Sequence, residues 1–375
     1  MPDFEVQLFL DANLQYNSYI IRGFSELADN TKVHLTTHAG IVSPTANKYR
    51  GYSVLIMKIR KKGERSWKIA AYDARDQNDQ ICPTSMGVCD IYFKVNHHPA
   101  SLSFLNEESY KRVRPIFPIF PVHPFIQTPA FYRHLPLVFA ATLAPGHFIT
   151  TNGRITRKSL RGGLTRLKQV PRKYLLLKRQ HHAVEQVEGY ANSAPTSDTI
   201  YYRPRVYQDN YDPAASEHRA AIVRILKAEF KNNYVGGFRP TKEAFARFPD
   251  LIDPSPDDQT SYFQKVAKSD IVINTNGMYD AFGWKLPEYM AMGRCILSQE
   301  LVNETQVPMQ DGKEVIFFKD DLSDFAPRLQ ALLNDRELRR HLAENARSYY
   351  ARYLKPVKQA EYILNTLFDE QFFAF

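Results

Sequence analysis

The residues with the clearest chemical potential lie between Asn274 and Gly293, where an apolar run gives way to a glycine-bearing loop and then to a helical pattern. In open α/β sheets, ligands bind beyond the carboxyl ends of the strands. Lys285 is predicted in the first turn of the helix, where a cation is unfavourable beside the helix dipole unless an anion is also bound. The free N–H groups of a helix start also suit phosphate. The pattern therefore predicts a phosphate site around Lys285.

Two neighbours of Lys285 extend this prediction. The carboxylate of Glu288 would lie within the same helix and could accept hydrogen bonds from hydroxyl groups, such as those of a ribose. Gly283 allows a tight turn before the helix. An ordinary strand–loop–helix unit is the alternative, but the spacing, the glycine, the lysine and the preceding apolar run agree with the functional interpretation.

The same segment resembles the retaining glycosyltransferases of the GT-B type. That family carries an acidic residue, then Phe-Gly, then a glutamate, then a small residue and a glycine, and the matching residues are Asp280, Phe282, Gly283, Glu288, Ala291 and Gly293. The resemblance implies that Glu288 binds the nucleotide ribose and that Asp280 contacts the donor sugar. An aspartate stands where the family usually has glutamate, so the stereochemical outcome stays open. The run from Trp284 onward looks like the glycosyltransferases of bacterial capsule and O-antigen gene clusters.

Arginines upstream are expected at the diphosphate of the donor. In the family, the first strand of the C-terminal domain delivers an arginine to this group, and the resemblance implies Arg205 for that role, with Arg203 in reserve. Arg219 and Arg239 are further donor-binding candidates. A guanidinium fork suits a diphosphate and would stabilise the charge that develops on the leaving nucleoside diphosphate.

Two carboxylates in the first half are candidates for a general base. Asp73 and Asp76 follow a predicted strand, which would place them at the carboxyl edge of a sheet. An inverting transferase needs a base near the acceptor hydroxyl, and two close carboxylates raise the pKa of one of them. A surface turn with solvated acids explains the same residues equally well.

The elements that must position these residues alternate between strand and helix patterns. In the first half this alternation predicts a layered α/β domain with a parallel sheet, and prolines interleaved with aromatic residues predict an irregular packed segment at 113–150. In the second half the predicted helices are 217–231, 260–268 and 285–292, and the predicted strands are 199–203, 234–238, 270–274 and 295–298. Asn334 with Glu337 resembles a capping box at the start of a further helix.

A small, polar stretch at 191–198 is the predicted linker between domains. It divides an acceptor-binding domain at 1–190 from a donor-binding domain at 199–350, and an apolar helical tail at 351–375 is expected to pack back on the N-terminal domain. The resemblance implies the GT-B architecture, in which two Rossmann-like domains face a central cleft and a C-terminal helix crosses back to the first.

Composition narrows the expected location and cofactors. The chain has 375 residues, a net charge of +9, three cysteines without a CxxC pair, and no signal-peptide pattern. No apolar run approaches the roughly 20 residues of a membrane-spanning helix. We therefore expect a cytoplasmic protein without a metal or cofactor, and basic clusters at 58–62 and 154–161 keep open a peripheral contact with the inner membrane face.

These features together predict a transferase of a hexosyl or related glycosyl group. It would move the sugar from a nucleotide-diphosphate sugar to an oligosaccharide or lipid-linked saccharide acceptor in bacterial surface polysaccharide synthesis. A nucleotide-sugar epimerase of the same fold is the alternative, and it would need no acceptor. A basic nucleic-acid-binding protein is a third hypothesis, although the sequence has no helix-turn-helix, zinc or RNA-binding pattern.

Overall fold

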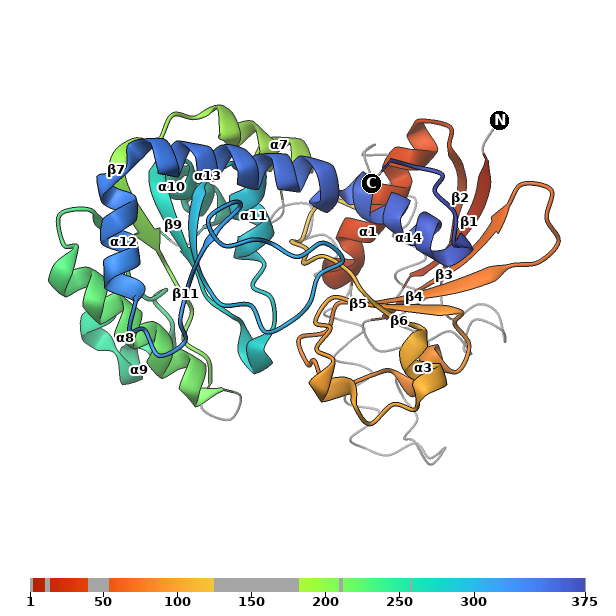
Figure 1. The fold of residues 1–375 in the computed structure, drawn as a ribbon, viewed down its shortest axis with the longest axis horizontal. Helices are drawn as coiled ribbons and strands as arrows, with labels where there is room; N and C mark the ends of the chain where they lie inside the picture. The colour runs from red at the N-terminus through yellow and green to blue at the C-terminus, as the bar shows by residue number, and fades with distance from the viewer. Residues whose placement is uncertain are drawn as a thin grey trace. The chain divides into compact units, whose positions relative to one another are not determined.

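The computed structural model describes residues 3–10, 14–39, 54–124, 182–208, 212–256 and 258–374. The chain divides into two units, one of Met1–Arg75, Asp79–Ala183 and Lys355–Phe375 and the other of Asp76–Asn78 and Val184–Leu354. Each unit is built on one sheet, with six strands in the first and five in the second (Figure 1). The predicted α/β fold class is confirmed.

The sheet of the first unit has the order β2-β1-β3-β4-β5-β6. Its strands are β1 (Phe4–Leu10), β2 (Val33–Ala39), β3 (Val54–Lys61), β4 (Lys68–Asp73), β5 (Ile91–Lys94) and β6 (Val113–Pro115). The prediction of a parallel sheet is wrong here, because β3 runs antiparallel to both of its neighbours. The short connection from β3 to β4 turns at Gly63, whose φ is +86°. A parallel crossover needs about a dozen residues or more, so this connection can only close a hairpin.

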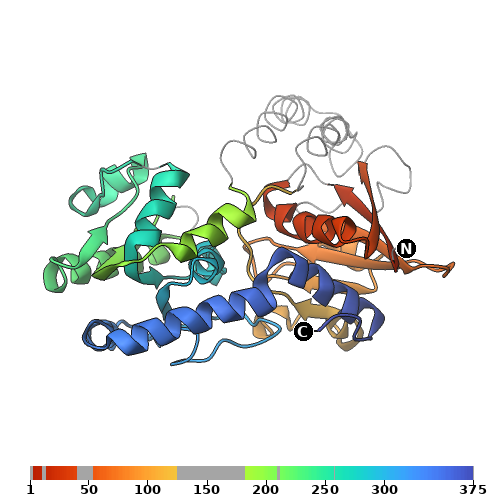
Figure 2. The same ribbon diagram turned by 90° about the horizontal axis from the view of Figure 1, so that it is seen from above.

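The described helices of the first unit are α1 (Leu14–Asp29), α2 (Pro83–Met86), α3 (Glu107–Lys111) and α14 (Pro356–Phe368). Although α1 and α14 come from distant parts of the sequence, they lie side by side (Figures 1 and 2). At Gly23 of α1 the backbone approaches Pro356 so closely that an added Cβ would lie 2.0 Å from its carbonyl oxygen. The ring of Tyr362 on α14 also packs against Phe93 of β5.

The second unit has a wholly parallel sheet in the order β11-β10-β9-β7-β8. Its strands are β7 (Thr196–Tyr202), β8 (Tyr234–Gly236), β9 (Ser269–Asn274), β10 (Cys295–Gln299) and β11 (Ile316–Phe318). Its helices are α7 (Val184–Gly189), α8 (Pro213–Glu229), α9 (Lys242–Arg247), α10 (Gln259–Lys268), α11 (Lys285–Ala291), α12 (Phe325–Asn334) and α13 (Arg336–Tyr349).

The strand order of this sheet reverses between β7 and β9. From β7 the chain passes through α8 to β8 on one side, and it then returns past β7 to build β9, β10 and β11 on the other. Neighbouring crossover loops therefore leave the carboxyl ends of β7 and β9 in opposite directions. In doubly wound sheets this switch point is where ligands bind.

Some predicted boundaries differ from the structure. Helix α12 was not predicted, and it ends at Asn334, so the true N-cap of α13 is Asp335, whose Oδ1 accepts a hydrogen bond from the Leu338 N–H at 2.8 Å. The unit boundary falls before α7, and β7 already begins at Thr196 within the predicted linker. None of the helices in the described ranges is long and apolar enough to cross a membrane. The basic cluster 154–161 and most of segment 113–150 lie outside the described residues.

Candidate functional site

Polar residues follow the ends of the neighbouring strands β7 and β9. Tyr202 ends β7, and its hydroxyl lies 3.1 Å from the hydroxyl of Thr275, the first residue after β9. The side chain of Asn274 donates to the Ser298 hydroxyl of β10 at 3.0 Å. The backbone N–H of Asn276 donates to the side chain of Gln299 at 2.9 Å. These bonds hold the strand ends and their loops together at the switch point.

Arg219 of α8 braces the loops that leave these two strands. Its guanidinium donates to the carbonyl of Arg205 at 2.9 Å and to the carbonyl of Asn276 at 2.7 Å. It also bonds the Tyr207 hydroxyl at 3.0 Å and lies 4.5 Å from the centroid of that ring. Although burial alone would lower the pKa of Arg219, Tyr207 and its other neighbours raise it overall. Arg219 is thus a permanent buried cation between the two loops.

Lys285, the first residue of α11, lies beside the same loops. Its Nζ donates to the backbone carbonyl of Arg203 and lies 5.8 Å from the centroid of the Tyr262 ring. Burial lowers its pKa to about 7; Arg219 lowers it further, and Glu288 opposes both effects. Because a nearby anion favours the charged form of a lysine, a phosphate placed next to Lys285 would stabilise its ammonium form and raise its pKa. Helix α11 has only seven residues, so the expected affinity for phosphate comes from its side chains and not from its dipole.

Glu288 is buried one turn after Lys285, with 7% of its surface exposed. Its Oε2 accepts a hydrogen bond from the Tyr262 hydroxyl at 2.7 Å. Burial raises the pKa of Glu288 to about 7, while the Tyr262 hydroxyl and Lys285 lower it. The lysine and the glutamate are therefore an electrostatically coupled pair whose charges respond to whatever binds beside them.

The loop between β9 and α11 is held in a strained conformation. Tyr279 and Asp280 both have a φ of +56°, which is uncommon for residues other than glycine. The Tyr279 N–H donates to the Asp212 carboxylate at 3.2 Å, and the Asp280 carbonyl accepts from the Asn303 amide at 2.6 Å. The Asp280 side chain is exposed. A Cβ at Gly283 would lie 3.3 Å from the Thr275 carbonyl, so a glycine suits this approach to the end of β9.

The three remaining arginine candidates differ in what they already bind. Arg203 is almost fully buried, pairs with the Asp253 carboxylate at 3.2 Å, and donates to the carbonyls of Ser255 and Pro256 at 2.7 and 2.8 Å. Its guanidinium is thus committed to this loop. Arg205 is exposed, and Arg239 is half-buried. The charge of Arg239 also lowers the pKa of Lys285, which puts it within electrostatic reach of that amine.

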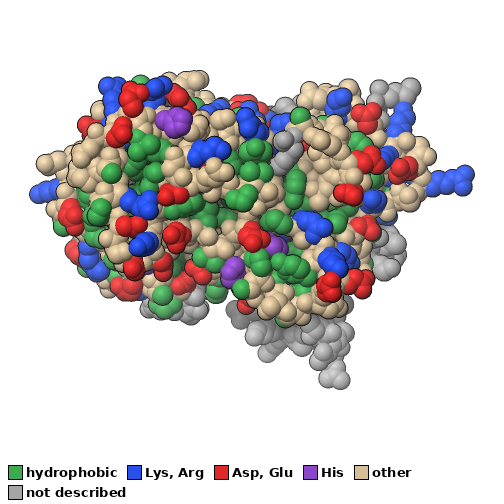
Figure 3. Space-filling view, viewed as in Figure 1, with side chains coloured by type: hydrophobic (Ala, Val, Ile, Leu, Met, Phe, Trp, Pro, Cys, Tyr) green, Lys and Arg blue, Asp and Glu red, His purple; other side chains and the backbone are tan. Residues whose placement is uncertain are grey.

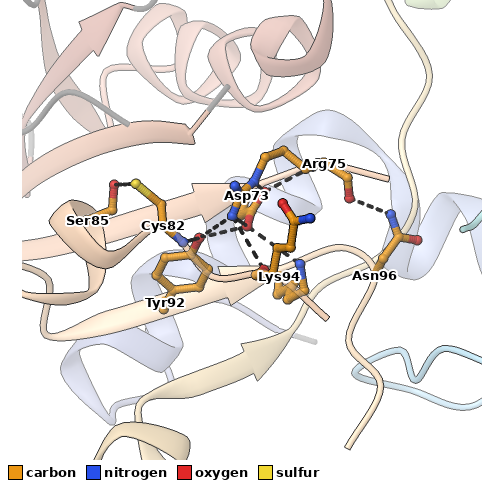
Figure 4. A network of polar contacts seen from close by, with 8 residues as sticks. Asp73, Arg75, Cys82, Ser85, Tyr92, Lys94 and Asn96 are labelled. Atoms are coloured by element: carbon orange, nitrogen blue, oxygen red, sulfur yellow. Dashed lines mark hydrogen bonds and ion pairs between the residues drawn. The ribbon is translucent and has the colours of Figure 1, made fainter. Parts of the chain in front are cut away.

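In the first unit, Asp73 lies at the centre of a buried polar network (Figure 4). Its carboxylate accepts from the Arg75 guanidinium at 2.8 and 2.9 Å and from the Tyr92 hydroxyl at 2.7 Å, and the Lys94 Nζ is 3.6 Å away. Burial alone would raise the pKa of Asp73, but Lys94 and Arg75 outweigh it and lower the pKa. A fully buried, ion-paired carboxylate is a poor general base and fits a structural role. Asp76 is half-buried and belongs to the second unit by its contacts.

The sequence pattern did not reveal every residue of this site. Tyr202, Tyr262, Thr275 and Asn276 were not predicted, because they contact the predicted residues only through the tertiary fold. The adjacent aromatic residues Tyr262 and Phe263 were a usable signal, because two neighbours on a helix cannot both point into the hydrophobic core. Phe263 is the one that is fully buried, which leaves Tyr262 available to the site. In the described ranges no three or more His, Cys, Asp or Glu side chains are grouped so as to hold a metal ion.

Comparison with known proteins gives one family match, to the second unit and part of α14. Residues 200–365 match the family described as Glycosyl transferase-like. No curated protein sequence matches the chain.

Several solved structures are distantly similar to this chain. WaaG, a glycosyltransferase involved in lipopolysaccharide biosynthesis, is 13% identical, covering 95% of this chain and 97% of that chain, with a TM-score of 0.40. Anabaena HepE in complex with UDP-glucose is 12% identical, covering 76% of this chain and 92% of that chain, with a TM-score of 0.34. The C-terminal domain of the glycosyl transferase group 1 family protein LpcC from Francisella tularensis is 16% identical, covering 45% and 92%, with a TM-score of 0.31. Similarities this distant place no residue of this chain.

Proposed function

We propose that this chain is a glycosyltransferase of GT-B architecture that binds a nucleotide-diphosphate sugar on its second unit. The observation that carries the proposal is the switch-point cluster, which we define as Tyr202, Arg219, Tyr262, Lys285 and Glu288. This cluster places two cations and one buried carboxylate where a doubly wound sheet binds ligands. The family match over residues 200–365 supports the same proposal.

The groups of the cluster suit the parts of such a donor. Lys285 would bind the diphosphate, because its lowered pKa reflects buried positive charge without enough negative charge nearby. Arg205 and Arg239 would also bind the diphosphate, whereas Arg203 and Arg219 would hold the loops that follow the strands in place. Glu288 would accept hydrogen bonds from the ribose. Asp280, exposed on its strained loop, would contact the sugar.

For the acceptor, we propose a saccharide that is bound by the first unit. Asp76 is the candidate base, because the Asp73 carboxylate is fully buried and ion-paired. We further propose that Lys285, Arg205 and Arg239 neutralise the diphosphate without a metal ion, so that EDTA should leave the rate unchanged.

The proposal is tested by incubating the protein with nucleotide sugars and a panel of saccharide and lipid-linked saccharide acceptors from bacterial surface polysaccharides. We expect acceptor-dependent release of the nucleoside diphosphate together with a product heavier by one glycosyl unit. Conversion of the nucleotide sugar without any acceptor would support the epimerase alternative. Binding of nucleotide without either reaction would overturn the assignment of an enzyme.

The pKa values of the coupled pair predict how nucleotide affinity depends on pH. Raising the pH through about 7 deprotonates Lys285 in the free protein, so binding of a diphosphate must then take up a proton and weakens. Lowering the pH through about 7 protonates Glu288, which then loses its strength as an acceptor. Isothermal titration from pH 5 to 9 should give a maximum near 7. Lys285→Met should remove the alkaline limb. Glu288→Gln should reduce the acidic limb to the part that the terminal phosphate of the nucleotide contributes, and a flat wild-type profile would contradict this account.

We also propose a cytoplasmic protein with a peripheral contact to anionic lipid, through the hairpin of β3 and β4. In Figure 1 this hairpin extends beyond the rest of its sheet, and Figure 3 shows Lys and Arg side chains projecting at that edge, with acidic ones among them. Lys62 and Arg65 are exposed near its tip. On the strands, Lys58 and Arg60 lie over the Trp67 ring.

A vesicle experiment tests this contact. Each basic residue near an anionic surface contributes about 1 kcal/mol, so replacing Lys62 and Arg65 by alanine should weaken binding to phosphatidylglycerol-containing vesicles about 30-fold. Sedimentation with vesicles measures the affinity. The matched control, Arg336→Ala with Arg340→Ala on the exposed side of α13, should change it little. Equal losses in both variants would mean that only net charge matters.

A further inference from the structure

We infer that Tyr262 is a positioning residue for Glu288, holding one carboxylate oxygen so that the other stays available to a ligand hydroxyl. The inference rests on the proposed function, because it concerns the same donor site. Tyr262 lies on α10 and Glu288 on α11, so the hydrogen bond of 2.7 Å joins two helices. Within the described residues, Tyr262 is the side chain that donates to this carboxylate, and its hydrogen bond goes to Oε2 and not to Oε1.

The surroundings of Tyr262 fix its hydroxyl in place. Its ring packs against Phe263 at 5.1 Å and against Tyr201 of β7 at 6.2 Å between ring centroids. The Lys285 ammonium group lies over the same ring. A ligand that drew Lys285 toward its phosphates would leave the phenol and the carboxylate in contact. The hydrogen bond from the Tyr262 hydroxyl therefore restricts rotation of the Glu288 side chain. Packing of the Tyr262 ring alone would not do so.

The titratable groups around the hydrogen-bonded pair of Tyr262 and Glu288 come from two elements. Lys285 and Tyr289 face the pair from α11, and Tyr201 faces it from β7. Burial raises the pKa values of Tyr262 and Tyr289 well above that of free tyrosine, so both phenols stay protonated across the range in which Glu288 titrates. Among these described groups, Lys285 and Glu288 are then the ones that change charge near pH 7.

The experiment compares wild type with Tyr262→Phe, which keeps the ring and removes the hydroxyl. The probe is whichever of UDP, GDP, CDP, ADP and dTDP binds wild type most tightly, and its affinity is measured by titration from pH 5 to 9. Loss of a hydrogen bond to an ionised group should move the acid limb of the profile up by about one pH unit and lower affinity at pH 6 about tenfold. The terminal phosphate titrates alike in every variant, so the difference between profiles reports on the protein.

Controls separate positioning from stability. Tyr349→Phe removes another buried hydroxyl, which donates to the Val307 carbonyl, and should leave the pH profile unchanged even if the protein melts earlier. In a Glu288→Ala background, Tyr262→Phe should have no further effect on affinity, because the partner is gone. Site-specific 3-fluorotyrosine at 262, a more acidic donor with nearly the same shape, should move the acid limb down.

The possible failures can be told apart. If wild type binds none of the five nucleotides, the proposed function fails. If wild type binds and Glu288→Ala does not, but Tyr262→Phe keeps the wild-type acid limb, the positioning role alone is wrong. If the fluorinated phenol leaves the limb in place, the hydroxyl does not act on the carboxylate and the inference is overturned.

Discussion

Replacing Lys285 by alanine should lower kcat/KM for sugar transfer by about two to three orders of magnitude. The loss corresponds to removing a preorganised charge from the leaving diphosphate, which is worth roughly 3–4 kcal/mol in a site with little water. The amine needs no long-range movement to act, because it already lies beside the strand-end loops, where it binds the Arg203 carbonyl. Steady-state kinetics with saturating acceptor measure the change.

Two comparisons define what the Lys285 result means. Lys285→Arg keeps a cation and should recover part of the rate. Lys268→Ala removes an exposed lysine at the end of α10 and should leave kcat/KM near the wild-type value. If Lys285→Ala and Lys268→Ala behave alike, the diphosphate does not bind at the switch-point cluster.

Gly236→Ala should be the most destabilising single substitution of this set. Gly236 ends β8 with a φ of +141°, and an added Cβ would lie 2.1 Å from the carbonyl oxygen of Tyr202. Backbone strain and the forced displacement of a neighbouring strand together cost about 3–5 kcal/mol. Urea denaturation followed by tryptophan fluorescence and circular dichroism should show the loss. Nucleotide affinity should also fall, since Tyr202 belongs to the cluster.

Gly312→Ala is the matched control for the positive φ. Gly312 has a φ of +77°, and an added Cβ would meet no atom within 4 Å. Its cost should be only the left-handed strain of roughly 1–2 kcal/mol. Equal destabilisation by the two alanines would mean that close packing against Tyr202 contributes nothing.

The parts of the fold that follow from local sequence were predictable. The β9–α11 segment was recognised because an apolar strand, a glycine loop and a helix follow one another without interruption. The mixed sheet of the first unit was missed because strand direction depends on the length of the β3–β4 turn, which the alternating pattern does not encode. The helix cap was assigned one residue too early because α12, which ends at Asn334, was not recognised.

Apart from Arg219, which the family resemblance supplied as a candidate, the site was predictable only where its residues are neighbours in sequence. Lys285 and Glu288 share α11, so their spacing reveals them. Tyr262 reaches Glu288 from α10, and no sequence pattern links the two helices. Arg203 and Asp73 show the opposite problem, because each has a suitable type near a strand end but is already ion-paired. Arg203 pairs with Asp253, and Asp73 pairs with Lys94 of β5 as well as with its sequence neighbour Arg75.

The most direct test of the central claim is a thermal-shift panel of UDP, GDP, CDP, ADP and dTDP on wild type and Glu288→Ala. A ligand at 100 times its Kd stabilises the folded protein by about 2.7 kcal/mol, enough to raise Tm by several degrees. We predict that at least one nucleotide raises the Tm of wild type and that the variant loses most of this shift. No shift with any nucleotide, or an equal shift in both proteins, would contradict a donor site at the switch point of the second unit.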